Sequence, residues 1–75
     1  MNKTRKTQIK EVITKINGCA DELDNIKFDE DYARENIPEN LQGGDAYCTS
    51  EDCSDKIEDA ISDLRQVASD LEEIS

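Results

Sequence analysis

Apolar residues recur at alternating steps of three and four along both halves of the chain, the spacing that places side chains on one stripe of an α-helix. In the first half the stripe consists of Ile9, Val12, Ile16, Cys19, Leu23 and Ile26. In the second half it consists of Ile57, Ala60, Leu64, Val67, Leu71 and Ile74. Each stripe is widened by two neighbouring residues, namely Ile13 and Ala20, and Ile61 and Ala68. The pattern predicts two amphipathic helices, at about residues 4–35 and 45–74.

The predicted helices are separated by residues 36–44, which contain the only proline and two of the three glycines. Proline disfavours helical backbone in the residue before it, so the first helix should end by Ile37. Gly43 and Gly44 allow a turn without a Cβ penalty, and Asp45 is a suitable N-cap for the second helix, with Thr49 as a rival start. Because a short connection makes neighbouring helices antiparallel, the sequence predicts an all-α fold: one antiparallel helical hairpin domain over residues 1–75.

A hairpin of this size needs further support. A chain this short buries only roughly 60% of the surface that its unfolded form exposes. Two helices with three apolar positions per heptad cannot cover each other, so we expect the hairpin to self-associate into a helical bundle, most simply a dimer with four helices. The predicted oligomer core consists of Ile9, Val12, Ile16, Leu23, Ile26, Ile57, Ile61, Leu64, Val67 and Leu71.

The net charge of −10 restricts the partners of the chain. Such a charge repels nucleic-acid backbones and anionic membranes, so we expect a basic protein partner, no direct nucleic-acid binding and no membrane association. The apolar runs are too short for a membrane span, and residues 1–10 lack the apolar middle of a secretory signal. The three cysteines are an odd number without an export signal. These features predict a cytoplasmic protein with reduced thiols.

Acidic residues are concentrated on the predicted second helix. They could imitate the phosphates of a nucleic acid and thereby occupy the basic groove of another protein. The alternative is a solvated face that only keeps the protein soluble. The candidate binding residues in this series are Asp52, Asp55, Glu58, Asp59 and Asp63.

The two ends of the chain carry opposite charges. Residues 1–17 hold five basic residues against Glu11 alone, a balance of +4, which leaves −14 for the remainder. Cations at a helix N-terminus and anions at a C-terminus oppose the helix dipole, so we expect another interaction to compensate. The expected ion pairs across the hairpin join Lys3, Arg5 and Lys6 to Asp70, Glu72 and Glu73. A basic grip for an acidic partner and an unstructured tail are the alternatives.

A symmetric hairpin pairs residues whose numbers sum to about 81, which places Cys53 opposite Lys27. The same register gathers Phe28, Tyr32 and Tyr47 near the turn. We expect these rings to seal that end of the core, together with the apolar turn residues Ile37 and Leu41. If their edges stay exposed, the three aromatic residues form a candidate contact surface for a partner.

The remaining chemistry argues against catalysis. Without histidine, a nucleophile would need a lysine or carboxylate base, and these are expected on exposed faces. No calcium loop or phosphate-binding glycine motif occurs, so we expect no enzyme activity, cofactor or metal. Cys19 and Cys53 are expected to be buried as small hydrophobic residues, and Cys48 to be the most reactive thiol. Gly18 should cost about 1 kcal/mol in a helix, so it indicates a close helix approach or a kink.

The turn also carries a resemblance. The run Asn36-Ile37-Pro38-Glu39-Asn40-Leu41-Gln42-Gly43 lies between two acidic amphipathic helices. It resembles the turn of a group of small uncharacterised helical-hairpin proteins from Gram-positive bacteria, their phages and mobile elements. The resemblance implies an all-helical hairpin and a phage or prophage origin, and it brings no activity and no catalytic residues. The cysteines and the basic first ten residues lie outside this pattern.

Together these features predict a binding protein. The first hypothesis is a phage or mobile-element accessory protein that binds a host or phage protein through its acidic helices or its turn. This protein would act as a nucleic-acid mimic if its acidic series occupies a basic groove. The second is a structural oligomer or assembly scaffold without a separate ligand, and the third is a thiol-dependent metal or redox device built from several chains.

Overall fold

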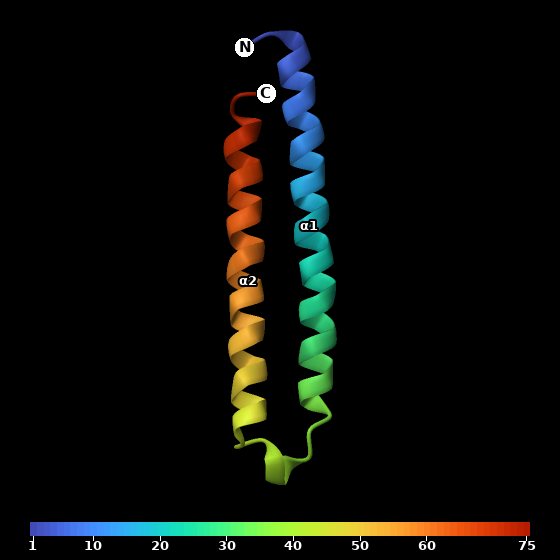
Figure 1. Ribbon diagram of the computed structural model, residues 1–75, viewed down its shortest axis with the longest axis vertical. Coiled ribbons are helices and arrows are strands. Elements are labelled where there is room, and N and C mark those ends of the chain that lie inside the picture. The colour runs from blue at the N-terminus through green and yellow to red at the C-terminus, as the bar shows by residue number, and fades with distance from the viewer.

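The computed structural model describes all 75 residues as two long helices joined by a short turn (Figure 1). Helix α1 comprises Lys3–Glu35, the 3₁₀ turn η1 comprises Glu39–Leu41, and helix α2 comprises Asp45–Glu72. The chain reverses at the turn, so α2 returns alongside α1 and both termini lie at the same end (Figure 1). The prediction of an all-helical hairpin with two helices and no strand is confirmed. The backbone forms a rod of 60 × 15 × 11 Å.

The ends of α1 are defined by two asparagines. The Asn2 side chain accepts a hydrogen bond at 2.8 Å from the backbone N–H of Arg5, which satisfies one of the free donors of the first turn. At the other end, Asn36 caps the helix and its backbone N–H donates to the carbonyl oxygen of Ala33 at 3.3 Å. The helix therefore ends two residues before Ile37, the residue that Pro38 restricts.

Helix α2 begins differently from the prediction. Gly44, not Asp45, is the N-cap, and no side chain caps this end. The prediction of Asp45 as N-cap is wrong: Asp45 is the first helical residue, where its charge still favours the positive end of the helix dipole. A Cβ on Gly44 would lie 3.2 Å from the carbonyl oxygen of Leu41, so close packing of the turn explains this glycine. The helix ends at Glu72, two residues before the predicted end.

The helices meet along a seam of two residues per heptad, the spacing of a coiled coil. Every seam residue is buried or half-buried. In α1 the seam consists of Ile9, Ile13, Ile16, Ala20, Leu23, Lys27, Glu30 and Arg34. In α2 it consists of Tyr47, Ser50, Ser54, Ile57, Ile61, Leu64, Ala68 and Leu71. Only five residues of the whole chain are buried: Ile13, Ala20, Ser50, Ser54 and Ala68.

The predicted apolar stripes therefore coincide only partly with the seam. Ile13 and Ala20, expected at its edge, are buried in it. Four residues expected at its centre remain about half exposed, namely Val12 at 45%, Ile26 at 54%, Val67 at 47% and Ile74 at 50%. The reason is geometric, because two helices can enclose two positions per heptad and the sequence supplies three. One apolar position in each heptad stays open to solvent.

The register of the hairpin differs from the predicted symmetric one. Residue numbers of side chains bonded across the helices sum to 84, 85, 86 and 88, not 81. The turn is asymmetric, since α2 starts beyond the end of α1 and the first turns of α1 extend beyond the end of α2 (Figure 1). No ion pair joins Lys3, Arg5 or Lys6 to the C-terminal carboxylates, so the predicted pairing of the two ends is wrong.

Gly18 does not serve a close helix approach. A Cβ built on it would meet no atom within 4 Å, and α1 runs through this position without interruption. The glycine is exposed and lies away from the seam. It therefore costs helix stability without a packing benefit.

Replacing Gly18 by alanine should raise the free energy of unfolding by about 1 kcal/mol, because alanine loses less backbone entropy in a helix interior. Urea unfolding followed by circular dichroism measures this change. Gly43→Ala is the matched control, since it also meets no atom within 4 Å but lies outside the helices, and it should have a smaller effect. A less stable Gly18→Ala variant would show that this glycine has a packing role after all.

Candidate functional site

A polar cluster joins the two helices in the half of the rod near the turn. We call it the Asp31 cluster, and it consists of Lys27, Asp31, Arg34, Ser50 and Ser54. The Ser54 hydroxyl donates to Asp31 Oδ1 at 2.6 Å, and Arg34 donates to the same oxygen at 2.9 Å. Lys27 Nζ donates to Asp31 Oδ2 at 3.0 Å. Arg34 also donates to Ser54 Oγ at 3.0 Å and to Ser50 Oγ at 3.4 Å. These bonds link α1 to α2.

Two small side chains make this cluster possible. Ser50 and Ser54 occupy seam positions of α2 and are buried, at 8% and 3% exposure. Their size leaves room for the longer side chains of α1, and their hydroxyls supply both donors and acceptors. No buried side-chain nitrogen or oxygen lacks a hydrogen-bond partner. The seam is therefore apolar near the termini and polar, but fully bonded, near the turn.

The cluster shifts the pKa values of its charged members. The hydrogen bond from Ser54, followed by those from Lys27 and Arg34, lowers the pKa of Asp31 to about 2. The bond to Asp31 raises the pKa of Lys27. Partial burial disfavours the charge of Arg34, but the hydrogen bond and charge of Asp31 outweigh this and raise its pKa. All three groups therefore stay charged over the whole neutral range.

The arrangement suits structure rather than chemistry. Both Asp31 oxygens accept hydrogen bonds from charged donors, and the Arg34 guanidinium carbon lies 5.9 Å from the centre of the Tyr47 ring. No member is left as a free base or nucleophile. A fully satisfied polar network of this kind favours one alignment of the helices, because a shifted register would break the hydrogen bonds that Ser50 and Ser54 form with α1.

The aromatic residues do not seal the core. Phe28 is 71% exposed and Tyr32 is 63% exposed, while Tyr47 is half-buried beside Arg34. The predicted apolar end cap is therefore wrong. The seam at this end is occupied by the Asp31 cluster, which leaves Phe28 and Tyr32 on the solvent side of α1. Their exposure keeps them as candidates for partner contact.

The apolar residues of the turn also contribute little to the expected sealing of the core. Ile37 is half-buried, but Leu41 is exposed at 56%. The Gln42 side chain donates to the carbonyl oxygen of Ile37 at 3.3 Å and so holds the turn together through a polar contact.

The acidic series of α2 lies open to solvent. All five predicted residues are exposed, and none of them forms an ion pair: Asp52, Asp55, Glu58, Asp59 and Asp63. Among the nineteen acidic residues of the chain, only Asp21 and Asp31 form ion pairs, the former with Arg65 at 3.0 Å. The negative charge of the surface is thus largely unneutralised.

The three cysteines are all exposed and none forms a disulfide. The prediction that Cys19 and Cys53 are buried is therefore wrong for the hairpin. Both side chains lie beside the seam rather than in it. The structure contains no group of three or more acidic or cysteine side chains arranged to hold a metal ion.

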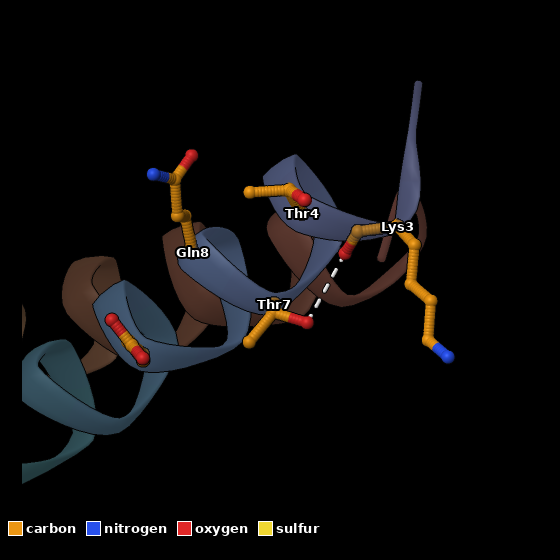
Figure 2. Close-up of a pocket in the computed structure, with 5 residues that line it drawn as sticks. Lys3, Thr4, Thr7 and Gln8 are labelled. Atoms are coloured by element: carbon orange, nitrogen blue, oxygen red, sulfur yellow. Dashed lines mark hydrogen bonds between the residues drawn. The ribbon is translucent and has the colours of Figure 1, made fainter.

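One surface depression occurs near the start of α1 (Figure 2). This part of α1 extends beyond the end of α2 (Figure 1). Five polar residues line the depression: Lys3, Thr4, Thr7, Gln8 and Glu11. Figure 2 shows the Thr7 hydroxyl directed at the carbonyl oxygen of Lys3, a hydrogen bond of 3.1 Å. Since all five side chains belong to one helix and none is apolar, the depression does not enclose a ligand.

In comparison with known proteins, the chain matches no protein-family model, no curated protein and no solved structure. The resemblance of the turn to small phage and bacterial hairpin proteins therefore stays a prediction. Neither helix is sufficiently long and apolar to cross a bilayer.

Replacing Asp31 by asparagine should destabilise the hairpin at neutral pH and reduce its sensitivity to acid. The folded pKa of about 2 lies below the ordinary value of 3.8. The ionised carboxylate therefore contributes stability that is fully present above pH 3.8 and is lost as the pH falls through 2. Between pH 4 and pH 2 the urea midpoint of the wild type should fall further than that of Asp31→Asn.

Asp29→Asn is the control for this comparison, since Asp29 is exposed and unpaired but carries the same charge. It should follow the wild type at every pH. Equal acid sensitivity of Asp31→Asn and the wild type would contradict the role of the Asp31 cluster.

Proposed function

We propose that this chain is a non-enzymatic protein–protein interaction module that binds a basic protein through the acidic outer surface of α2. The observation that supports this most directly is the absence of any ion pair at Asp52, Asp55, Glu58, Asp59 and Asp63. Charges that are not neutralised within the molecule remain available to a partner of opposite sign.

The geometry of α2 suits this role. Asp52, Asp55, Asp59 and Asp63 follow one another at steps of three and four, so they form a ridge along one side of the helix with about 5–6 Å between successive Cβ atoms. A straight row of carboxylates on a thin rod can enter a groove that normally holds a nucleic-acid backbone. Together with the resemblance of the turn, this supports a phage or mobile-element accessory protein that inhibits its target as a nucleic-acid mimic.

A second candidate function is structural self-association in the cytoplasm. Val12, Ile26, Val67 and Ile74 are about half exposed, although they have the composition of a protein core. We propose that the antiparallel hairpin forms a dimeric four-helix bundle, which would cover these residues and leave the acidic ridge of α2 outside. The two roles are compatible, because they use different surfaces.

Neutralising the ridge should weaken capture of a basic partner. The variant Asp55→Asn, Asp59→Asn, Asp63→Asn removes three exposed charges of the ridge, and if each contact contributes about 0.5 kcal/mol the affinity falls by about tenfold. The tagged wild type and variant are compared by capture from a host lysate at low and high salt, with partners identified by mass spectrometry. We expect a basic protein that is released as salt rises.

The matched control changes three exposed carboxylates of α1, Glu11→Gln, Glu22→Gln and Asp29→Asn, which alters the net charge equally. It should retain the partner. If both variants lose it equally, net charge rather than the ridge is responsible; a partner that survives high salt and both variants would contradict the proposal.

Substitution of an exposed apolar residue should separate the subunits. Val67→Asp places an unpaired carboxylate where the second copy would pack, at a cost well above the roughly 1.4 kcal/mol that corresponds to a tenfold change in affinity. Sedimentation equilibrium should show a wild-type dimer and a weakened variant. Ser69→Asp adds the same charge to a neighbouring exposed position away from the apolar residues and should leave the dimer intact. A monomeric wild type would contradict self-association.

A further inference from the structure

The two flanks of the seam have opposite character. In α1, Val12, Cys19, Ile26 and Ala33 each lie directly before a seam residue. In α2, Cys53, Ala60, Val67 and Ile74 hold the equivalent positions. Two antiparallel helices are related by a two-fold rotation about an axis perpendicular to the plane that contains both. This rotation leaves each flank on the same side of that plane, so these eight residues lie on one side of the rod. We call it the apolar flank.

The opposite flank holds the residues directly after seam positions. Among them are Lys10 and Asp24 in α1 and Glu51, Glu58 and Glu72 in α2. No aliphatic residue occurs at these positions. The aliphatic surface of the two helices thus lies on one side only, as expected for half of a bundle, while the exposed rings of Phe28 and Tyr32 lie elsewhere on α1.

The residues of the apolar flank form four layers across the two helices. The layers pair Val12 with Ile74, Cys19 with Val67, Ile26 with Ala60, and Ala33 with Cys53. Each pair has residue numbers that sum to 86, the register of the observed contact between Asp21 and Arg65. The layers decrease in size along the rod, from two branched residues near the termini to two small residues near the turn.

This gradient decides how a second copy fits. If the two rods lie head to tail, Val12 meets Ala33 of the second copy, Ile26 meets Cys19, Val67 meets Ala60, and Ile74 meets Cys53. Every contact then joins a large residue to a small one, which gives even packing along the interface.

A parallel arrangement would instead place Val12 on Ile74 and Ala33 on Cys53. Large residues would meet at one end and small ones at the other, so one end would be overfilled and the other would contain voids, and both defects are destabilising.

The charge distribution favours the same orientation. Residues 1–17 carry a net charge of +4, whereas Glu35, Glu39 and Asp45 surround the turn. Head-to-tail packing brings the basic end of each copy beside the acidic turn of the other, and it gives the first turns of α1, which extend beyond α2, a neighbour (Figure 1). Parallel packing would bring the two acidic turns together.

We propose that a second copy of the chain docks on the apolar flank head to tail, with α1 against α1 and α2 against α2. This inference rests on the self-association proposed above and specifies its surface and its orientation. The second copy is the occupant that matches the flank in size, layer by layer, and in charge, end to end. The acidic ridge of α2 remains on the outside of the four-helix bundle.

Disulfide cross-linking tests the orientation. The variant Cys19→Ala, Cys48→Ser, Ile74→Cys keeps the native Cys53 and adds one thiol. Within one chain, positions 53 and 74 are about 30 Å apart along α2, so a bond between them must join two copies. Mild oxidation with copper phenanthroline, followed by trypsin digestion and mass spectrometry, should give a cross-linked dimer in which position 53 is bonded to position 74.

Two further variants complete the experiment. Glu72→Cys in place of Ile74→Cys puts the thiol on the opposite flank and should give little cross-link to Cys53. A chain without native cysteines that carries Val12→Cys and Ala33→Cys should form the disulfide bond between positions 12 and 33 of two copies. If circular dichroism shows that the first variant does not fold, this second variant tests the orientation of the dimer.

The outcomes separate the two proposals. A dimer by sedimentation that yields neither the bond between 53 and 74 nor the bond between 12 and 33 would overturn the head-to-tail docking on the apolar flank and leave self-association standing. A monomeric wild type would overturn both self-association and this inference, while binding of a basic partner by the acidic ridge would be unaffected.

Discussion

In a pair of helices, each helix covers only the strip of its partner that faces it. This limit determines the architecture of the whole molecule. The facing strip takes two positions in every seven, and here it is filled by an uninterrupted series on both helices. The third apolar position has no partner within the chain. The small number of buried residues, the thin rod and the one-sided apolar surface all follow from this mismatch between the sequence pattern and the geometry of a helix pair.

The seam changes character along its length, and the change fixes the alignment of the helices. An apolar seam alone tolerates displacement by a heptad, since one aliphatic contact resembles the next. The hydrogen bonds that Ser50 and Ser54 of α2 form with Arg34 and Asp31 of α1 are directional and are complete in only one alignment. The observed register thus agrees with the demands of the Asp31 cluster and differs from the register that the length of the turn suggests.

The periodicity of the sequence was sufficient to predict the two helices and the turn, because long regular patterns are strong signals. It could not show which two of the three apolar positions face each other, since Val12 and Ile13 are equally apolar neighbours. Only the polar residues distinguish the positions that face the other helix from those that do not. Toward the turn, the observed seam passes through Lys27 and Arg34 in α1 and through Ser54 in α2. A search restricted to apolar residues misses this continuation.

The same omission explains the errors near the turn. Phe28 and Tyr32 were expected in the core because the symmetric register gathered the aromatic residues near the turn, whereas the Asp31 cluster occupies that space. The expected ion pairs between the chain ends failed for a different reason, as they depended on a symmetric turn. The exposure of the acidic series of α2 could be predicted without knowing the register of the hairpin, and the observed exposure agrees with the sequence pattern.

The change of character along the seam divides the rod into two halves that respond to different conditions. Near the termini the helices are held by aliphatic contacts, which weaken on cooling and are little affected by salt. Near the turn they are held by the hydrogen bonds of Ser50 and Ser54, which do not depend on the hydration of apolar surface. Cooling therefore loosens the hairpin from its open end, while the closed end next to the turn keeps its contacts.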